Sequence, residues 1–339
     1  MKETIVDLRS DTVTKPTKEM LDAMFSAEVG DDVFEEDPTV TSLEEQSAKI
    51  FGKEAGLFCT SGTLANQVAL KILTQPMQEV ICDRASHLYC HEGAGYAFNS
   101  GISVRTIDGD RGRITAQDII NNINPDYDHV PVTSLVSIEN TCNKGGGSFY
   151  SLEQIQSVYE TCKKNNLKLH LDGARIFNAL SASNNSPGDI GKYFDTISFC
   201  LSKGLGAPVG SLILSSKENI KKARRVRKVW GGGMRQTGYL AAAGIFALNN
   251  NIQRLKKDHE RASVIAGTIS KLSYIEETMP VDTNIIVFKI KKDVKSFLKH
   301  LDNKNIKAIP FGEKTIRMVT HLDIDDDMIE RTVKALRAF

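Results

Sequence analysis

The sequence lacks several features that would assign it to a class at once. No apolar run approaches the roughly 18 residues that a membrane-spanning helix needs, and residues 1–7 contain no apolar stretch typical of a signal peptide. The 43 Lys and Arg residues are balanced by 42 Asp and Glu residues, which leaves a net charge of +1 and no basic surface for nucleic acid. We therefore expect a cytoplasmic protein that binds neither membranes nor nucleic acid.

Disulfide bonds and structural metal sites are not expected either. The six cysteines form no C-x-x-C pair and have no spacing typical of metal ligands. Several lie within apolar runs, such as Leu57-Phe58-Cys59 and Val80-Ile81-Cys82. Cysteines in such runs are typical of the buried, reduced thiols of cytosolic proteins.

What the sequence does contain is an alternation of short β-rich runs with longer helical patterns. Strands are expected over residues 79–83, 103–108, 134–139, 168–172, 196–201 and 210–215. Helices are expected over residues 62–73, 116–122 and 152–164. This alternation predicts an α/β fold, with a mainly parallel sheet covered on both faces by helices. Ligands of such sheets bind beyond the carboxyl ends of the strands.

The pattern changes after Gly231-Gly232-Gly233. Long helices are expected over residues 236–249 and 258–272, followed by alternating strands and helices up to residue 339. We expect a large domain formed by residues 1–250 and a small α+β domain formed by residues 251–339. Residues 1–15 are expected to pack against the small domain.

Two polar residues follow apolar strands at the edge where a ligand would bind. Asp172 ends the run His170-Leu171-Asp172, and Lys203 lies in Ser202-Lys203-Gly204. Pyridoxal phosphate (PLP) needs a lysine that holds it as a Schiff base and a carboxylate on its pyridine nitrogen. Asp172 and Lys203 are therefore the first candidates for a reaction centre. Taken singly, an Asp or Lys at a strand end is more often a cap or a solvated loop residue.

Two further segments suit the same cofactor. Ser61-Gly62-Thr63 opens a helix after a short apolar strand, where free N–H groups and two hydroxyls can bind phosphate. A plain N-cap is the alternative interpretation of this segment. His87 follows the strand at residues 79–83 and could stack on the cofactor ring and transfer protons; a surface loop histidine is the alternative. His170 lies in the middle of a strand and is expected in the core, and no companion groups are found in the sequence for His91, His129, His259 and His300.

Three residues could bind a substrate carboxylate. They are Ser10, Arg175 and Arg317. Arginine suits this task because its planar fork matches a carboxylate with two hydrogen bonds. Arg317 is favoured because it lies in an otherwise apolar strand, where an unpaired charge would be costly.

Seven short segments occur in a fixed order between residues 4 and 320. They are Asp7-Leu8-Arg9-Ser10-Asp11-Thr12, Gly30-Asp31-Asp32-Val33, Asp37-Pro38-Thr39-Val40, Ser61-Gly62-Thr63, His170-Leu171-Asp172-Gly173-Ala174-Arg175, Ser202-Lys203-Gly204 and Gly231-Gly232-Gly233-Met234-Arg235-Gln236. Together they resemble the low-specificity L-threonine aldolases, which are PLP enzymes of the aspartate-aminotransferase fold type. The resemblance implies a fold type I large domain with a mainly parallel seven-stranded sheet and a small α+β carboxyl-terminal domain.

The resemblance also implies an activity and roles for individual residues. A β-hydroxy-α-amino acid such as L-threonine or L-allo-threonine would be cleaved to glycine and an aldehyde by a retro-aldol reaction through a quinonoid. Lys203 would hold PLP, Asp172 would pair with the ring nitrogen and His87 would stack on the ring. The other implied cofactor contacts are Ser61, Gly62, Thr63, Arg175, Ser202 and Arg235. The implied substrate contacts are Ser10, Arg175, Arg317 and the residue at position 142, together with Lys228. The family forms homotetramers, in which Arg235 and Lys228 approach the site of a neighbouring subunit.

The sequence departs from the family pattern at two places. Cys142 stands in Glu139-Asn140-Thr141-Cys142-Asn143, where family members often have histidine near the substrate hydroxyl. A thiol is a weak hydrogen-bond donor and cannot replace an imidazole as a base. Phe34-Glu35 replaces a Tyr-Gly that is common after Gly-Asp-Asp-Val, which removes a hydroxyl. Both changes bear on the choice of substrate and leave the expected PLP site intact.

Three other functions are compatible with parts of the sequence. Another PLP enzyme of the same fold, such as a β-eliminating lyase or an aminotransferase, would use the same Asp and Lys, because a fold does not determine a reaction. A non-catalytic binding protein of this fold would have no need for Lys203, Asp172 and His87. A nucleotide-binding oxidoreductase is disfavoured, because neither Gly145-Gly146-Gly147 nor Gly231-Gly232-Gly233 has G-x-G-x-x-G spacing.

Overall fold

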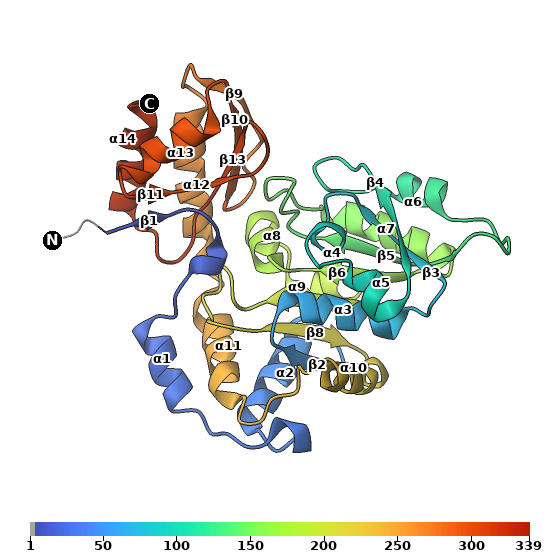
Figure 1. Ribbon diagram of the computed structural model, residues 1–339. Helices are drawn as coiled ribbons and strands as arrows, with labels where there is room; N and C mark the ends of the chain where they lie inside the picture. Colours follow the sequence, from blue (N-terminus) through green and yellow to red (C-terminus); the bar gives the residue numbers. More distant parts are fainter. Residues whose placement is uncertain (1–3) are drawn as a thin grey trace.

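A seven-stranded sheet forms the centre of the computed structural model, which describes residues 4–339 (Figure 1). Its strands are β2 (Ala55–Cys59), β3 (Gln78–Asp83), β4 (Ser103–Ile107), β5 (Val132–Glu139), β6 (Lys168–Asp172), β7 (Thr196–Cys200) and β8 (Ser211–Ser215). They lie in the order β2-β8-β7-β6-β5-β3-β4. Only β8 runs antiparallel to its neighbours, so the sheet is mainly parallel as predicted.

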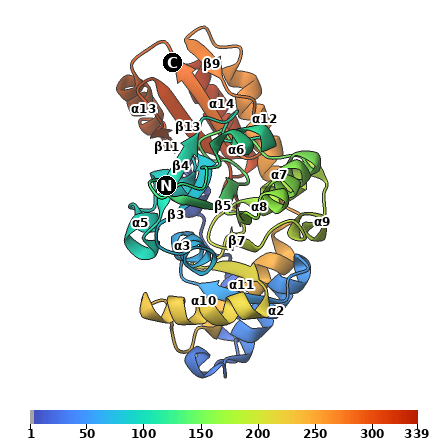
Figure 2. The same ribbon diagram turned by 90° about the vertical axis from the view of Figure 1, so that its right-hand side faces the viewer.

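Helices cover both faces of this sheet, as Figure 2 shows. Alternate residues of β2 face opposite ways: Leu57 and Cys59 pack with α3 (Gly62–Leu73) and α10 (Lys217–Val229), whereas Phe58 belongs to the main core. That core includes residues of α7 (Leu152–Lys164) and α8 (Ile176–Ser183). Since both faces are covered, every residue of β7 and β8 is buried, including the polar Thr196 and Ser198.

Further helices of this part of the chain precede, connect or follow the strands of the sheet. They are α1 (Lys18–Phe25), α2 (Pro38–Ile50), α4 (His87–Cys90), α5 (Gly95–Ser100), α6 (Ala116–Asn122), α9 (Pro187–Gly191) and α11 (Gly238–Asn250). Two short 3₁₀ helices cover Asp11–Val13 and Asp32–Phe34. No helix within residues 4–339 is both long enough and apolar enough to cross a membrane.

A second, smaller sheet follows α12 (Leu255–Ile269). It is antiparallel, in the order β12-β13-β10-β9, and its strands are β9 (Ile275–Thr278), β10 (Ile285–Ile290), β12 (Ile309–Pro310) and β13 (Thr315–Val319). Helices α13 (Val294–Asp302) and α14 (Asp326–Arg337) complete this α+β unit, together with the short strand β11 (Ile306–Lys307).

The amino-terminal segment joins this smaller unit. Strand β1 (Val6–Asp7) pairs in parallel with β11, and Val6 and Leu8 belong to the apolar core formed with α12, α13 and α14. Figure 1 shows the blue β1 beside the red β11. The chain then leaves this unit through the 3₁₀ turn at Asp11–Val13 and enters α1, so residues near position 10 lie between the two sheets.

Candidate functional site

The predicted reaction centre lies where three parallel strands end. Glu139 of β5 is in register with Asp172 of β6, and Asp172 is in register with Ser198 of β7. Because parallel strands end at the same edge of a sheet, these side chains are neighbours. Lys203 follows β7 in a turn, half-buried, and lies near enough to His87 and Asp11 for its charge to act on both. The structure therefore brings Asp172, Lys203 and His87 into one neighbourhood.

A buried amide that the sequence did not single out holds Asp172 in place. Asn66 of α3 donates from Nδ2 to Asp172 Oδ2 at 2.7 Å and to Glu92 Oε1 at 2.8 Å. Its carbonyl oxygen accepts from Ser198 Oγ at 2.6 Å. The other Asp172 oxygen, Oδ1, accepts from the backbone N–H of Ala174 at 3.1 Å. The signal in the sequence was a polar residue on the buried face of the helix that Ser61 opens.

His87 is fixed by two carboxylates. Its backbone N–H donates to Glu139 Oε2 at 2.8 Å, and its ring Nδ1 lies 2.9 Å from Glu92 Oε1. Glu92 is fully buried and also accepts from Gln67 Nε2 at 2.6 Å. The hydrogen bond from Glu92 raises the pKa of His87 above its ordinary value, and the charge of Asp172 acts in the same direction. This arrangement orients the ring and leaves Nε2 for a bound group.

Two observations concern the surroundings of His87. Its ring centroid lies 5.5 Å from that of His91, so His91 does have a companion group, contrary to the expectation from the sequence. His87, Glu92 and Asp172 place ligand-type atoms within 4.8 Å of one another. Because the hydrogen bonds from Asn66 and Gln67 already account for the two carboxylates, we assign no metal to them.

The candidate carboxylate-binding residues lie at the junction of the two units. Arg175 donates from Nε and Nη2 to Asp11, both at 2.7 Å, and this ion pair is buried. Arg175 lowers the pKa of Asp11 well below its ordinary value. Ser10 caps the 3₁₀ turn and accepts from the Thr12 N–H at 3.3 Å, so its backbone lies directly beside this pair.

Arg317 differs from Arg175 because its direct partners are all neutral. It donates to Asn143 Oδ1 at 2.8 Å and to the Arg9 carbonyl at 3.1 Å, and its buried Nε has no partner within residues 4–339. Burial and the charge of Arg175 lower the pKa of Arg317 to about 10. An anion at this position would neutralise a buried guanidinium that is otherwise unpaired.

The segment Ser61-Gly62-Thr63 begins helix α3 close to the end of β7. Ser61 Oγ accepts from the Leu64 N–H at 3.1 Å, so the N-cap interpretation is confirmed. A Cβ on Gly62 would lie 2.8 Å from Cys200 Sγ, which means that only glycine lets the helix approach the strand that leads to Ser202 and Lys203. Ser61 is exposed and Thr63 and Ser202 are half-buried, so all three remain accessible to a ligand.

Cys142 lies near the site but faces the core. It is 3 % exposed, and its thiol donates to the Glu139 carbonyl at 3.1 Å. Burial raises the pKa of this thiol well above its ordinary value. A Cβ on Gly112 would lie 3.2 Å from Cys142 Sγ, so the sulfur packs against that turn. Cys142 is therefore a neutral thiol that cannot act as a base.

Arg235 and Lys228 lie apart from these residues, on the surface. Arg235 is 54 % exposed and pairs with Asp31 at 2.8 Å, and Lys228 is exposed near the end of α10. Phe34, at the second departure from the family pattern, is 68 % exposed, and Glu35 has a left-handed backbone with φ of 62°.

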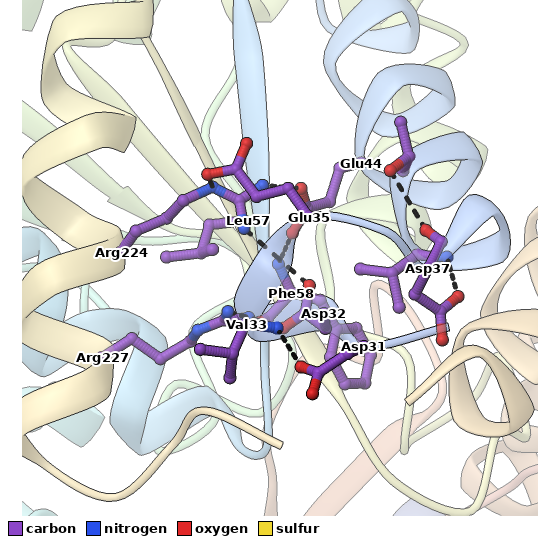
Figure 3. Close-up of polar contacts among 12 residues, drawn as sticks. Asp31, Asp32, Val33, Glu35, Asp37, Glu44, Leu57, Phe58, Arg224 and Arg227 are labelled. Atoms are coloured by element: carbon purple, nitrogen blue, oxygen red, sulfur yellow. Dashed lines mark hydrogen bonds and ion pairs between the residues drawn. The ribbon is translucent and has the colours of Figure 1, made fainter. Parts of the chain in front are cut away.

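A buried ion network anchors this surface, as Figure 3 shows. Arg227 donates to Asp32 Oδ2 at 2.6 Å and to the Phe58 carbonyl at 2.7 Å. Arg224 pairs with Glu44 of α2 and lies 3.8 Å from Asp32. The network ties α10 to α2, β2 and the Asp32–Phe34 turn, and so determines where α10 presents Lys228.

Comparison with known proteins decides the family. Residues 7–293 match the family model described as beta-eliminating lyase. The chain is 41 % identical over 339 residues to the low specificity L-threonine aldolase of Escherichia coli K12, covering 99 % of each protein. It is 42 % identical to a protein of Arabidopsis thaliana named probable low-specificity L-threonine aldolase 2, with 96 % of this chain and 94 % of that protein covered.

The chain belongs to the low-specificity L-threonine aldolase family. The resemblance drawn from the seven sequence segments is thereby confirmed. A solved threonine aldolase of Leishmania major has the same fold, with a TM-score of 0.86 and 20 % identity, covering 98 % of this chain and 99 % of that one. A putative L-allo-threonine aldolase of Listeria monocytogenes matches with a TM-score of 0.83 and 21 % identity, covering 98 % and 96 %. These two structural matches confirm the predicted fold class.

Proposed function

We propose that this protein uses PLP to cleave L-threonine, L-allo-threonine and related β-hydroxy-α-amino acids to glycine and an aldehyde. The observation that carries the proposal is the buried Arg317, which has only neutral direct partners, in the same site as Asp172 and Lys203. Its unpaired Nε supports an anionic substrate group, while the Asp and Lys at neighbouring strand ends support the cofactor. The family membership adds the class of substrate.

The residues present fit the cofactor. Lys203 would hold it covalently, and Asp172, oriented by Asn66, would pair with its pyridine nitrogen. The start of α3 would bind its phosphate through Ser61, Gly62 and Thr63. When bound, PLP supplies an electron sink for the pair released from the Cα–Cβ bond.

The protein side chains would then position the substrate. Arg317 would bind the substrate carboxylate, with Ser10 and Arg175 beside it at the junction of the two units. Because Asp11 occupies two nitrogens of Arg175, we expect Arg317 to make the stronger contact. His87, held by Glu92, would stack on the cofactor ring and keep its orientation during the reaction.

The deciding experiment is product analysis with purified protein, added PLP and each threonine diastereomer. Release of glycine and acetaldehyde, with visible absorbance that Lys203→Ala abolishes and Lys222→Ala retains, is the expected result. Lys222 is a matched control because it lies on the surface and pairs with Glu218. Ammonia and an oxo acid instead of glycine would mean that the protein is a β-eliminating lyase. If neither set of products forms even with PLP present, an enzymatic function is contradicted.

Arg317→Met tests the proposed carboxylate contact. Charged hydrogen bonds contribute roughly 1.5–3 kcal/mol each, so we expect kcat/KM for L-threonine to fall about 10- to 100-fold, mainly through KM. Arg84→Met is the control, since Arg84 pairs with Asp108 on the surface. An unchanged KM would remove Arg317 from the substrate site.

We also infer a homotetramer in which Lys228 and Arg235 approach a neighbouring subunit's site. The support is an exposed apolar surface beside them: Val229 is 81 % exposed and Phe34 68 %. A hollow of 370 Å³ between α10 and the Asp32–Phe34 turn lies at the same place. Exposed apolar side chains grouped around a hollow are typical of subunit interfaces.

The interface is tested by light scattering coupled to size-exclusion chromatography. We expect wild-type protein to elute as a tetramer and Val229→Asp to dissociate, while the exposed Val264→Asp, on α12, leaves the assembly unchanged. A wild-type monomer with full activity would contradict the proposal.

For the compartment we propose the cytoplasm, supported by six free cysteines, five of them buried.

A further inference from the structure

His91 stands beside the reaction centre and has no assigned role. It follows α4, four residues after His87, and its ring centroid lies 5.5 Å from the ring centroid of His87 at an interplanar angle of 55°. The His91 N–H donates to the His87 carbonyl at 2.8 Å, so both rings leave the same helical turn. The His91 ring is exposed and has no hydrogen-bond partner within residues 4–339. A free imidazole that close to His87 is available to a substrate.

Two charged groups lie near His91. Lys144 and Arg317 both act on its pKa, and both flank the Phe311 ring, with Lys144 Nζ 4.2 Å and Arg317 Cζ 4.9 Å from the ring centroid. Arg317 is the residue proposed to hold the substrate carboxylate. In an amino acid, the carboxylate carbon and the β-carbon are both bonded to Cα, so a side chain near Arg317 can reach the β-substituents.

The two histidines have opposite electrostatic surroundings. Glu92 raises the pKa of His87, whereas partial burial together with the charges of His87, Lys144 and Arg317 lowers the pKa of His91, and Glu92 opposes that shift. His91 is therefore the neutral partner of the pair near neutral pH, with a lone pair available to accept a proton. Neighbouring titratable groups whose pKa values are pushed apart typically divide the acid and base roles between them.

We propose that His91 is the base that accepts the β-hydroxyl proton of the substrate, in place of the imidazole that relatives often carry at position 142. The inference rests on the proposed retro-aldol function. Cys142 cannot supply the base because its thiol is buried and neutral. His87 is less suited because its Nδ1 is bound to Glu92 and its raised pKa favours the protonated ring.

The step balances in protons and electrons. The β-hydroxyl proton moves to a His91 ring nitrogen, and the O–H electron pair becomes the second bond of the aldehyde carbonyl. The Cα–Cβ pair would remain on Cα, for which a bound PLP would supply the electron sink. Cα then takes a proton to give glycine, and His91 returns its proton to solvent.

The test compares wild type with His91→Phe, which keeps a flat ring of similar size but removes the nitrogens, and with His129→Phe as an exposed control. A general base typically contributes about 10²- to 10⁴-fold, so we expect kcat/KM for L-threonine to fall at least about 10²-fold in His91→Phe, mainly in kcat. The visible absorbance of the cofactor should be unchanged. Wild-type kcat/KM should fall as pH drops through the pKa of His91, below its ordinary value of about 6.5, and this acidic limb should disappear in the variant.

A binding measurement makes the proposal testable without turnover. Rapid-mixing spectra of the holoenzyme give dissociation constants for L-threonine and for L-2-aminobutyrate, which has the same skeleton without the hydroxyl. We expect wild type to prefer threonine and His91→Phe to lose that preference. A variant that keeps the wild-type preference, the wild-type pH profile and kcat/KM within about threefold would overturn the role of His91 and leave the aldolase function intact. Wild-type protein that binds threonine but yields no glycine would contradict the proposed function instead.

Discussion

At the scale of single residues, the site consists of a reactive set supported by a buried hydrogen-bonded set. Asp172, Lys203 and His87 were predictable because each follows an apolar strand at the edge where ligands bind. Glu92 and Asn66 were not, because a buried polar residue in a helix or loop has the same sequence signal as an exposed one. Glu92 contacts Asn66 and Gln67 of α3 and His87 of α4, and such a carboxylate is recognised only when those elements are packed together.

Glu92→Gln tests whether this carboxylate controls His87. The change removes the charge that raises the pKa of His87, so we expect that pKa to fall towards its ordinary value of about 6.5. A histidine whose pKa is raised in the folded protein stabilises that protein fully at pH values below the pKa of the unfolded chain. This stabilisation is lost as the pH rises through the folded-state pKa. The wild type should therefore lose this stability above about pH 6.5, whereas the variant lacks it throughout.

The measurement is the His87 ring pKa by NMR, with unfolding free energies on both sides of neutral pH. The exposed Glu313→Gln is the control and should match wild type in both. An unaltered His87 pKa in Glu92→Gln would show that Glu92 does not control this ring.

At the scale of elements, α10 is held by charge rather than by a wide apolar face. Seven of its thirteen residues are Lys or Arg, yet Arg227 is buried against Asp32 and the Phe58 carbonyl (Figure 3). Such a composition is typical of a solvated helix face, which describes the exposed Lys221 and Lys222 but not the buried Arg227. The composition alone could not distinguish them, since the acidic partners lie far away in the chain.

Arg227→Met should destabilise the protein strongly. Breaking a buried ion pair from one side costs about 3–5 kcal/mol, because Asp32 is left buried beside only the more distant Arg224. Lys222→Met removes an exposed ion pair with Glu218 and should cost less than about 1 kcal/mol.

Urea denaturation of both variants gives the two free energies. Adding Asp32→Asn to Arg227→Met should recover part of the loss, because no unpaired charge then remains. Equal costs for the Arg227 and Lys222 variants would contradict the assigned burial.

At the scale of the whole molecule, distant parts of the chain meet at one junction. Asp11 pairs with Arg175 across 164 positions, and Arg317 reaches the Arg9 carbonyl across 308. Two histidines have a pKa lowered by burial within this architecture: the fully buried His170 in β6 and the half-buried His259 in α12. Burial lowers the pKa of each to about 4, so both are neutral in the folded protein.

These histidines should make the protein acid-sensitive. A lowered pKa means that the unfolded chain binds protons more readily, so this stabilisation is present above about pH 6.5 and is lost as pH falls towards 4. Each histidine contributes a slope of at most about 1.4 kcal/mol per pH unit in that interval. His259→Gln should therefore give a flatter dependence of unfolding free energy on pH than wild type.

His129→Gln, which changes an exposed histidine, should follow the wild-type curve. Denaturant midpoints measured at several pH values check both variants. A His259→Gln curve parallel to wild type over the whole interval would show that His259 is protonated equally in the folded and unfolded chains.

Periodicity and short motifs are local properties, so the class of fold, the strand ends that carry Asp172 and Lys203, and the family could all be predicted from the sequence. It predicted α7 and β6 with the bounds that the structure has, but not β9 or β12, which are short and partly exposed. Only the tertiary structure decided that Glu92 holds His87, that Cys142 faces the core and that His91 stands beside the site. Those facts depend on which distant residues share a buried space, and that follows from packing and not from spacing along the chain.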